Sequence, residues 1–166
     1  MRRILLDTNI YGWALEKEVI ADLLAFFAEK KQTREIVVLG SEIINKEINA
    51  NPYREARERM KELYQAVISG EIRLTESVES LANIYFNVCE EKRIKITLED
   101  CGIVSSASLA GVDVIITDNR STMSNAKSIE IFDSINRKRK LKHFKFMNSD
   151  EAIRMFFSKN GNRAAS

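Results

Sequence analysis

Short apolar runs alternate with longer segments of helical periodicity along most of the chain. The runs at residues 4–6, 35–39 and 112–116 are rich in Ile, Val and Leu. Such runs are typical of strands buried on both faces of a parallel sheet. Two shorter segments, at residues 71–74 and 144–146, predict an edge strand and a last strand.

Between these runs, apolar residues recur at helical spacing, which predicts amphipathic helices. We expect helices over residues 10–31, 41–49, 53–69 and 78–92, another from Thr97 to Gly111, and a last one from Asn148 or Ser149 to residue 157. Ser41 and Thr97 are suited to cap their helices. Pro52 is suited to open a helix. Residues 129–132 fit either a short strand or part of a helix.

The alternation of strands and helices predicts an α/β protein with a parallel sheet. The chain has 166 residues, and its composition of 45% apolar and 30% charged residues is that of an ordinary soluble globular protein. We therefore expect a single domain over residues 1–158 and a flexible tail over residues 159–166.

Cysteine usage and hydropathy indicate a cytoplasmic protein with no membrane segment. Cys89 and Cys101 lie in partly apolar, helix-like patterns without metal-ligand spacing, so we interpret them as reduced core thiols. No run approaches the ~18 apolar residues of a membrane span. Because the chain enters a strand within its first few residues, we expect no signal peptide.

Charge is nearly balanced overall, with a net charge of +2, but one region is strongly basic. It contains Arg137, Lys138, Arg139, Lys140, Lys142, His143 and Lys145, interleaved with Phe144 and Phe146. Such a run can contact RNA phosphates. It is equally consistent with a solvated turn before a strand.

Four acidic residues stand out by position. Asp7 and Asp118 each end a buried strand, at the edge where parallel sheets place their ligands. Asp100 falls in the first turn of an expected helix, and Glu47 follows Ser41 by six residues on a partly apolar face. Taken singly, each of the three aspartates is also explained as a helix cap, and Glu47 as a solvated side chain.

Taken together, these acids favour a metal site. Carboxylates that share a pocket repel one another, and a hard divalent cation such as Mg²⁺ or Mn²⁺ relieves that repulsion. Such an ion can activate water and stabilise the charge that develops on a phosphodiester. His143 is the only histidine, which excludes a His-based triad or a paired-His zinc site. No phosphate-binding glycine motif is present either.

Several segments resemble the PIN-domain family, the fold of VapC-type toxins and related metal-dependent ribonucleases. Residues 4–9, Ile-Leu-Leu-Asp-Thr-Asn, resemble the opening motif of that family. The later motifs are matched in order by residues 41–48, 98–107 and 111–118, and the closing strand and helix by residues 144–157. The resemblance therefore covers nearly the whole chain.

This resemblance implies a three-layer α/β/α sandwich with a central, mainly parallel sheet. It also implies that Mg²⁺ or Mn²⁺ is held chiefly by Asp7, Asp100 and Asp118 and orients a water for attack on RNA. Glu47 would complete the cluster or assist a second ion. The supporting residues would be Thr8, Asn9, Thr117 and Asn119. An antitoxin protein and a second copy of the chain are the further partners that it implies.

Two departures from the family pattern leave alternatives open. Asp118 directly follows Thr117, and Asn119 stands where the family usually has an aspartate. Either the site is weakened, since a neutral amide is the poorer ligand, or Asp118 rotates in to compensate. The helix at 53–69 and the region 120–142 are longer than in compact toxins, so an RNA-processing nuclease is as consistent with the sequence as a toxin.

Two other functions are consistent with parts of the sequence. Asn119 motivates a PIN-like module that binds RNA or a protein without cutting. A phosphatase of the haloacid-dehalogenase type also starts with an Asp after its first strand. It needs a second Asp where Asn9 stands, so the sequence disfavours it.

Overall fold

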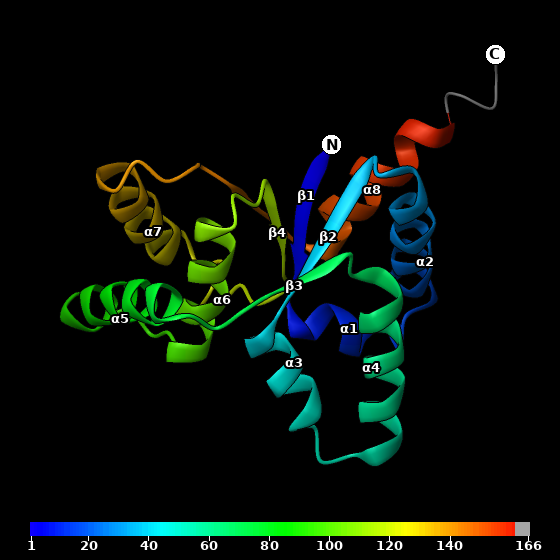
Figure 1. Cartoon of the computed structure of the whole chain (residues 1–166), viewed down its shortest axis with the longest axis horizontal. Helices are drawn as coiled ribbons and strands as arrows, with labels where there is room; N and C mark the ends of the chain where they lie inside the picture. Colours follow the sequence, from blue (N-terminus) through cyan, green and yellow to red (C-terminus); the bar gives the residue numbers. More distant parts are fainter. Residues whose placement is uncertain (162–166) are drawn as a thin grey trace.

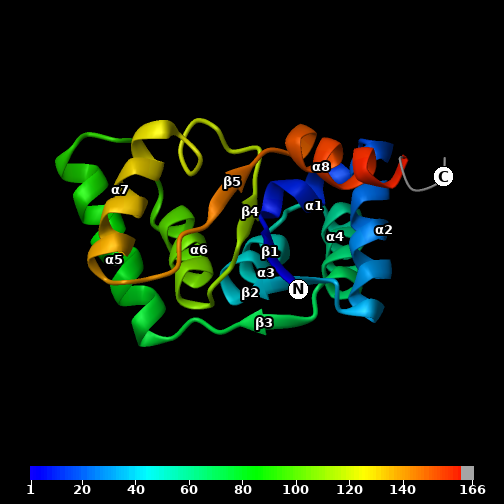
Figure 2. The same ribbon diagram turned by 90° about the horizontal axis from the view of Figure 1, so that it is seen from above.

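Five parallel strands form the centre of the molecule, in the order β3-β2-β1-β4-β5 (Figure 2). The computed structural model describes residues 1–161 of the chain. The strands are β1 (Arg2–Leu6), β2 (Ile36–Ser41), β3 (Gly70–Ile72), β4 (Val114–Ile116) and β5 (Lys145–Met147). Every neighbouring pair is parallel, so all five carboxyl ends lie at one edge of the sheet.

Helices cover both faces of the sheet, which confirms the three-layer α/β/α sandwich (Figure 1). They are α1 (Thr8–Ala14), α2 (Glu18–Thr33), α3 (Glu42–Asn49), α4 (Arg54–Val67), α5 (Glu76–Glu91), α6 (Leu98–Leu109), α7 (Ala126–Lys138) and α8 (Ser149–Gly161). Helices α5, α6 and α7 lie on one side, and α1, α2, α4 and α8 on the other (Figures 1 and 2). Within residues 1–161, no helix is long and apolar enough to cross a membrane.

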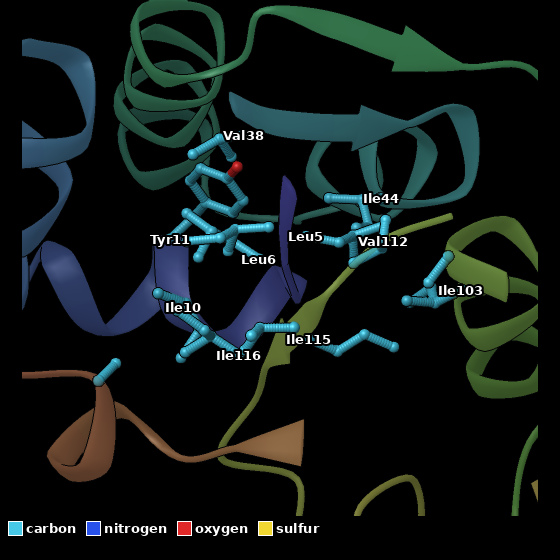
Figure 3. Packing of buried hydrophobic residues seen from close by; sticks show 14 of the residues in the cluster. Leu5, Leu6, Ile10, Tyr11, Val38, Ile44, Ile103, Val112, Ile115 and Ile116 are labelled. Atoms are coloured by element: carbon cyan, nitrogen blue, oxygen red, sulfur yellow. The ribbon is translucent and has the colours of Figure 1, made fainter. Parts of the chain in front are cut away.

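Strand β1 is central because its side chains are apolar on both faces. Ile4, Leu5 and Leu6 are fully buried, and β1 pairs with β2 on one side and β4 on the other. Figure 3 shows Leu5 and Leu6 packed among side chains from several elements of the core. The predicted two-faced burial of this strand is therefore confirmed, and it fixes the place where Asp7 leaves the sheet.

Helix α6 lies close to its neighbours because its side chains are small. Every residue from Asp100 to Ser108 is buried, and the serine hydroxyls are satisfied by carbonyl groups. Ser105 donates to the carbonyl of Val78 in α5, at 2.7 Å. A Cβ at Gly102 would collide with the Ile43 side chain, so the glycine allows α3 and α6 to approach. This packing brings Glu47 on α3 toward Asp100 on α6.

The structure corrects several expected boundaries. The helix expected over residues 10–31 is two helices, α1 and α2, separated by Lys17 in an extended conformation. Each helix buries its own apolar face, and a single straight helix could not place both faces against the sheet. Residues 129–132 are helical within α7. The expected edge strand at 71–74 is shorter and begins one residue earlier, at Gly70.

The C-terminal helix is longer than predicted. It begins at Ser149 and continues to Gly161 rather than ending at residue 157. Of the two expected caps, Asn148 is the one found, because its side chain accepts from the Glu151 backbone N–H at 2.9 Å. Residues 159–161 of the expected tail are therefore helical. The remainder of that expected tail, residues 162–166, lies outside the residues that the structure describes.

Candidate functional site

Three of the four predicted acidic residues line one hollow at the carboxyl edge of the sheet. The hollow has a volume of about 340 Å³. Its wall consists of Asp7, Thr8, Asn9, Gly12, Glu47, Asn51, Met60, Asp100 and Asn119. The acids come from the loop after β1, from α3 and from the first turn of α6. Segments distant in sequence therefore deliver carboxylates to one place.

Asp7 is held rigidly by three neighbouring groups. Its Oδ1 accepts from the backbone N–H of Thr8, at 2.8 Å, so Asp7 also caps α1. Its Oδ2 accepts from the Thr117 hydroxyl at 2.6 Å and from the Asn9 amide at 3.0 Å. The side chain is almost completely buried, and burial is the main reason that its pKa rises from 3.8 to about 6. The nearby charges of Asp100 and Asp118 add to the rise, and the bonds to Thr117 and Thr8 oppose it.

Glu47 faces the same hollow from α3. Its Oε2 accepts a hydrogen bond from the Thr8 hydroxyl. Burial raises the pKa of Glu47 from 4.5 to about 7, and the charges of Asp7, Asp100 and Glu99 raise it further, against the effect of the Thr8 bond. A carboxyl group with this pKa holds its proton readily near neutral pH in the absence of a cation.

Asp100 is fixed by the loop that follows β4. Thr97 caps α6 by accepting from the Asp100 backbone N–H, at 3.0 Å, which leaves the Asp100 side chain free to face the hollow. Its Oδ2 accepts from the Thr122 hydroxyl at 2.7 Å, and its Oδ1 accepts from the Asn119 amide at 3.4 Å. The amide of Asn119 thus donates to Asp100 where an aspartate would repel it.

Asp118 is turned toward α8 and is not part of the wall of the hollow. Its Oδ1 accepts from the Ser149 backbone N–H and its Oδ2 from the Ser149 hydroxyl, both at 2.8 Å. Asp118 therefore binds the first residue of α8, beside the Asn148 cap, and does not cap the helix that follows Asp118 in sequence. Entry of Asp118 into the hollow would require both of these hydrogen bonds to break.

The donor chemistry of the hollow fits a hard divalent cation. Carboxylate and amide oxygens from Asp7, Glu47, Asp100 and Asn119 are the ligand types that Mg²⁺ and Mn²⁺ prefer. Across residues 1–161, no three Asp, Glu, His or Cys side chains lie close enough together to hold one ion. Mg²⁺ is commonly held by one or two protein carboxylates and several waters, so a pair of these acids is a sufficient donor set.

The sequence did not identify several residues that shape the hollow. Thr122 bonds both Asp100 and Asn119, and its spacing of three residues from Asn119 is typical of a polar turn. Asn51 and Met60 enter the wall from the α3–α4 connection and from α4. Nothing in their local sequence indicates that position, because it depends on how α4 packs.

A larger hollow adjoins the carboxylates and shares Glu47 with them. Its volume is about 640 Å³, and it lies between α3, α5 and α6. Apolar side chains such as Ile43, Leu74 and Leu98 form much of its wall. The carboxylate hollow is therefore not isolated, and space for a larger ligand continues beyond Glu47.

The basic run lies at the other end of the molecule from this site. Arg137 and Lys138 form the last turn of α7, and Arg139 and Lys140 follow it. Helix α7 starts after the carboxyl end of β4 and returns the chain to the start of β5. Its basic end therefore lies near the amino edge of the sheet, away from Asp7 and Asp100.

Comparison with known proteins identifies the fold. No protein-family model matches the chain, and no curated protein sequence matches it. Solved structures do match, among them VapBC2 from Rickettsia felis bound to a DNA fragment from its promoter. That match has 15% identity and a TM-score of 0.58, and it covers 88% of this chain and 98% of the other.

Two further solved structures give the same result. VapBC-1 from nontypeable Haemophilus influenzae matches with 14% identity and a TM-score of 0.56, over 88% of this chain and 97% of the other. DNA-bound VapBC from Salmonella typhimurium matches with 14% identity and a TM-score of 0.55, over 89% and 98%. In such complexes VapC is the PIN-domain toxin. The chain therefore has the PIN-type fold, as the resemblance of its motifs predicted.

Proposed function

We propose that this protein is a Mg²⁺- or Mn²⁺-dependent endoribonuclease that hydrolyses RNA phosphodiester bonds. The observation that carries the proposal is the convergence of Asp7, Glu47 and Asp100 on one hollow at the carboxyl edge of the sheet. The PIN-type fold, which the solved VapBC structures share, supports it. A shared fold is compatible with several activities, so we infer the type of reaction from the carboxylates and not from the fold.

The acids themselves explain why a cation is needed. Three carboxylates in one hollow repel a phosphodiester, which is also an anion. The raised pKa values of Asp7 and Glu47 reflect the burial of both groups and, to a smaller extent, this crowding. When bound, Mg²⁺ or Mn²⁺ would supply a Lewis acid and an activated water. Asp7 and Asp100 would hold the ion, with Glu47 at its side and the Asn119 amide within the same wall.

The remaining residues keep the two principal ligands in place. Thr8, Asn9 and Thr117 fix both oxygens of Asp7, and Thr122 and Asn119 fix those of Asp100. Carboxylates that are already oriented lose little entropy when they bind an ion. Asp118, assigned to the metal set by the resemblance, would join it only after releasing Ser149.

Cleavage of a labelled single-stranded RNA with and without Mg²⁺ or Mn²⁺ tests the proposal. Asp7→Asn and Asp100→Asn should each lower the rate at least about 100-fold, since each removes charge stabilisation of several kcal/mol. Asp22→Asn, at an exposed position on α2, is the matched control and should cut like the wild type. Cleavage that persists in EDTA, or in both site variants, would overturn the assignment.

A binding module that does not cut RNA is the second candidate, and Asn119 favours it. An amide at this position donates to Asp100 and supplies no negative charge for an ion. Tight RNA binding with intact RNA at millimolar Mn²⁺ would support this candidate over the nuclease.

The toxin of a toxin–antitoxin pair and an RNA-processing enzyme are the two biological roles proposed for such a nuclease. The matched structures are VapBC complexes, which favours an antitoxin as partner. We also propose a cytoplasmic homodimer. Growth arrest on expression, relieved by a small protein encoded beside the gene, would identify a toxin. Mass measurement in solution would test the dimer.

A further inference from the structure

Cationic side chains are concentrated where α7 ends. We call Arg137, Lys138, Arg139, Lys140, Lys142 and Lys145 the cationic cluster. All six are exposed. They occupy the last turn of α7, the connection to β5 and the first residue of β5, a stretch that carries no acidic residue. The net charge of +2 therefore conceals a strongly positive region.

Few of these charges are neutralised by the protein itself. Lys142 pairs with Asp113, and His143, beside the cluster, pairs with Asp133. Arg137, Lys138, Arg139, Lys140 and Lys145 form no ion pair with any residue in the described part of the chain. The helix dipole favours a cation in the last turn, and α2 and α3 also carry basic residues there. Only Arg137 and Lys138 of the cluster lie in the last turn of α7, so the dipole does not account for all six cations.

The cluster is mounted on a rigid base. Asn136, immediately before it, is buried and hydrogen-bonded to Tyr85 and to Ser108. The backbone N–H of Leu141 returns to the carbonyl of Asn136 at 2.9 Å, across a left-handed Lys140. This closure anchors the backbone at the end of α7 between buried Asn136 and half-buried Leu141. The backbone that carries the charges is therefore fixed, while the exposed Lys and Arg side chains keep their rotamer freedom.

The aromatic residues of the run are not part of this surface. Phe144 is 4% exposed, and it packs against Phe146, which in turn packs against Phe132 in the core. Stacking of RNA bases needs exposed aromatic faces. The surface therefore offers charge without a stacking platform, and the ligand chemistry that it fits is a row of phosphates.

The cluster is far from the carboxylates. Helix α7 has 13 residues. It is therefore about 20 Å long at ~1.5 Å per residue, and the cluster lies at the end away from the loop that carries Asn119 and Thr122. At ~3.4 Å per nucleotide, the spacing along one strand of B-form DNA, the length of α7 corresponds to about six nucleotides.

We propose that the cationic cluster is a second RNA-binding surface that grips the phosphate backbone about six or more nucleotides from the cleaved bond. This inference rests on the proposed ribonuclease function. RNA is favoured over an acidic protein because it is the proposed substrate and carries one regularly spaced charge per nucleotide, which suits a stretch of closely spaced cations. The surface also offsets the repulsion that the acidic hollow exerts on RNA.

The first experiment measures binding alone, by fluorescence anisotropy in EDTA, with RNAs of about 30 and about six nucleotides. The variant replaces four residues: Arg137→Gln, Lys138→Gln, Arg139→Gln and Lys140→Gln. Its affinity for the long RNA should be lower by about tenfold or more. The slope of log affinity against log salt concentration should be flatter by about 3, since each phosphate contact contributes about 0.7–0.9 to that slope. In EDTA the acidic hollow repels RNA, so the short RNA can bind only at the cluster, and the variant should weaken its binding as well.

The matched control removes four exposed cations elsewhere: Arg54→Gln, Arg59→Gln, Lys92→Gln and Lys95→Gln. It has the same net charge, so a general charge effect would weaken both variants equally. Equal affinities and salt slopes in the two variants would overturn the proposal. A loss confined to binding of polyaspartate, with RNA binding intact, would overturn it in favour of an acidic protein partner.

The second experiment separates this proposal from the proposed catalysis. The cluster variant should keep the wild-type rate on the short RNA and show a raised KM with an unchanged kcat on the long one. If the wild type cuts neither RNA but the cluster variant still loses long-RNA affinity, the binding surface stands and the nuclease assignment fails. If cleavage depends on metal but the cluster variant cuts both RNAs with the same kcat and KM as the wild type, the proposed binding surface is wrong and the nuclease assignment stands.

Discussion

The hydroxyl of Thr117 donates a 2.6 Å hydrogen bond to Oδ2 of Asp7, and so links the ends of two adjacent strands across 110 positions of sequence. Both residues are buried. The bond lowers the pKa of Asp7 against the larger effect of burial. Thr117 therefore helps to keep Asp7 ionised, which is the state that binds a cation.

Replacement of this hydroxyl tests its role. Thr117→Val keeps the shape of the side chain and removes the donor, so the pKa of Asp7 should rise above its value of about 6. We expect divalent-metal affinity at pH 7 to fall about tenfold, as for other groups that support a ligand. Calorimetric titration with Mn²⁺ measures this change. Thr117→Ser retains the hydroxyl and should bind like the wild type; equal affinity for Thr117→Val would contradict the role.

Glu47 should make stability depend on pH in a defined direction. Its pKa is raised from 4.5 to about 7, so the folded state binds the proton more tightly than the unfolded state does. That contribution to stability is complete below pH 4.5 and is lost as the pH rises through about 7. Glu47→Gln removes the charge and should stabilise the metal-free protein at high pH by about 1 kcal/mol, or about 2–4 °C in Tm.

Thermal unfolding in EDTA, at pH 4.5 and at pH 8.5, measures this difference. The gain should be present at pH 8.5 and absent at the lower pH. Glu62→Gln, at an exposed position on α4, is the control and should change Tm at neither pH. A Glu47→Gln gain that is the same at both values would mean that the effect is not electrostatic.

The parts of the fold that the sequence predicted are those with local causes. The apolar run before Asp7, the cap at Thr97 and the cap at Ser41 each depend on residues within a few positions, and each is found as predicted. The convergence of Asp7, Glu47 and Asp100 could be expected from a parallel sheet, because parallel strands bring their carboxyl ends to one edge.

The parts that the sequence did not predict have distant causes. Asp118 looked equivalent to Asp7 because both follow a buried strand, yet Asp118 bonds Ser149, 31 positions later. That partner is available only once α8 has docked. The break between α1 and α2 was missed because both segments are apolar at helical spacing. Only the position of the sheet requires the chain to turn near Lys17.

The pair of Asp118 and Ser149 allows capping and metal binding to be separated. If capping dominates, Asp118→Asn and Ser149→Ala should each destabilise the fold by about 1–2 kcal/mol, and the double variant by little more than either alone. Urea unfolding of the wild type, the two single variants and the double variant measures this double-mutant cycle. Metal affinity should be unchanged in Ser149→Ala. A loss of Mn²⁺ affinity in Asp118→Asn alone would instead return Asp118 to the ligand set.

Asn119→Asp tests whether the amide weakens the site. Asn119 donates to Asp100 Oδ1 at 3.4 Å, and an aspartate there would repel it. The metal-free variant should therefore be less stable at pH 8 by about 1 kcal/mol. It should also bind Mn²⁺ several-fold more tightly and cut RNA faster. Asn125→Asp, at the cap of α7, is a control that adds the same charge outside the hollow. Unchanged metal affinity in Asn119→Asp would show that position 119 does not reach the ion.

Gly40 governs the approach of α4 to the strand that leads into α3. A Cβ on Gly40 would collide with the Tyr64 hydroxyl, which accepts from the Ser41 backbone N–H at 2.9 Å and donates to Glu71 at 2.6 Å. Gly40→Ala should displace Tyr64, break these bonds and cost about 1–3 kcal/mol. Because Ser41 caps the helix that carries Glu47, cleavage should fall as well.

Gly70→Ala is the matched control for this substitution. Gly70 lies in the neighbouring strand β3, and a Cβ there would meet nothing within 4 Å. Its variant should be as stable as the wild type or slightly more stable, since alanine restricts the unfolded chain. Urea unfolding of both variants, together with their cleavage rates, compares the two positions. Equal stability of Gly40→Ala and Gly70→Ala would mean that Tyr64 can move aside without cost, and the contact between α4 and β2 would not then set the position of Glu47.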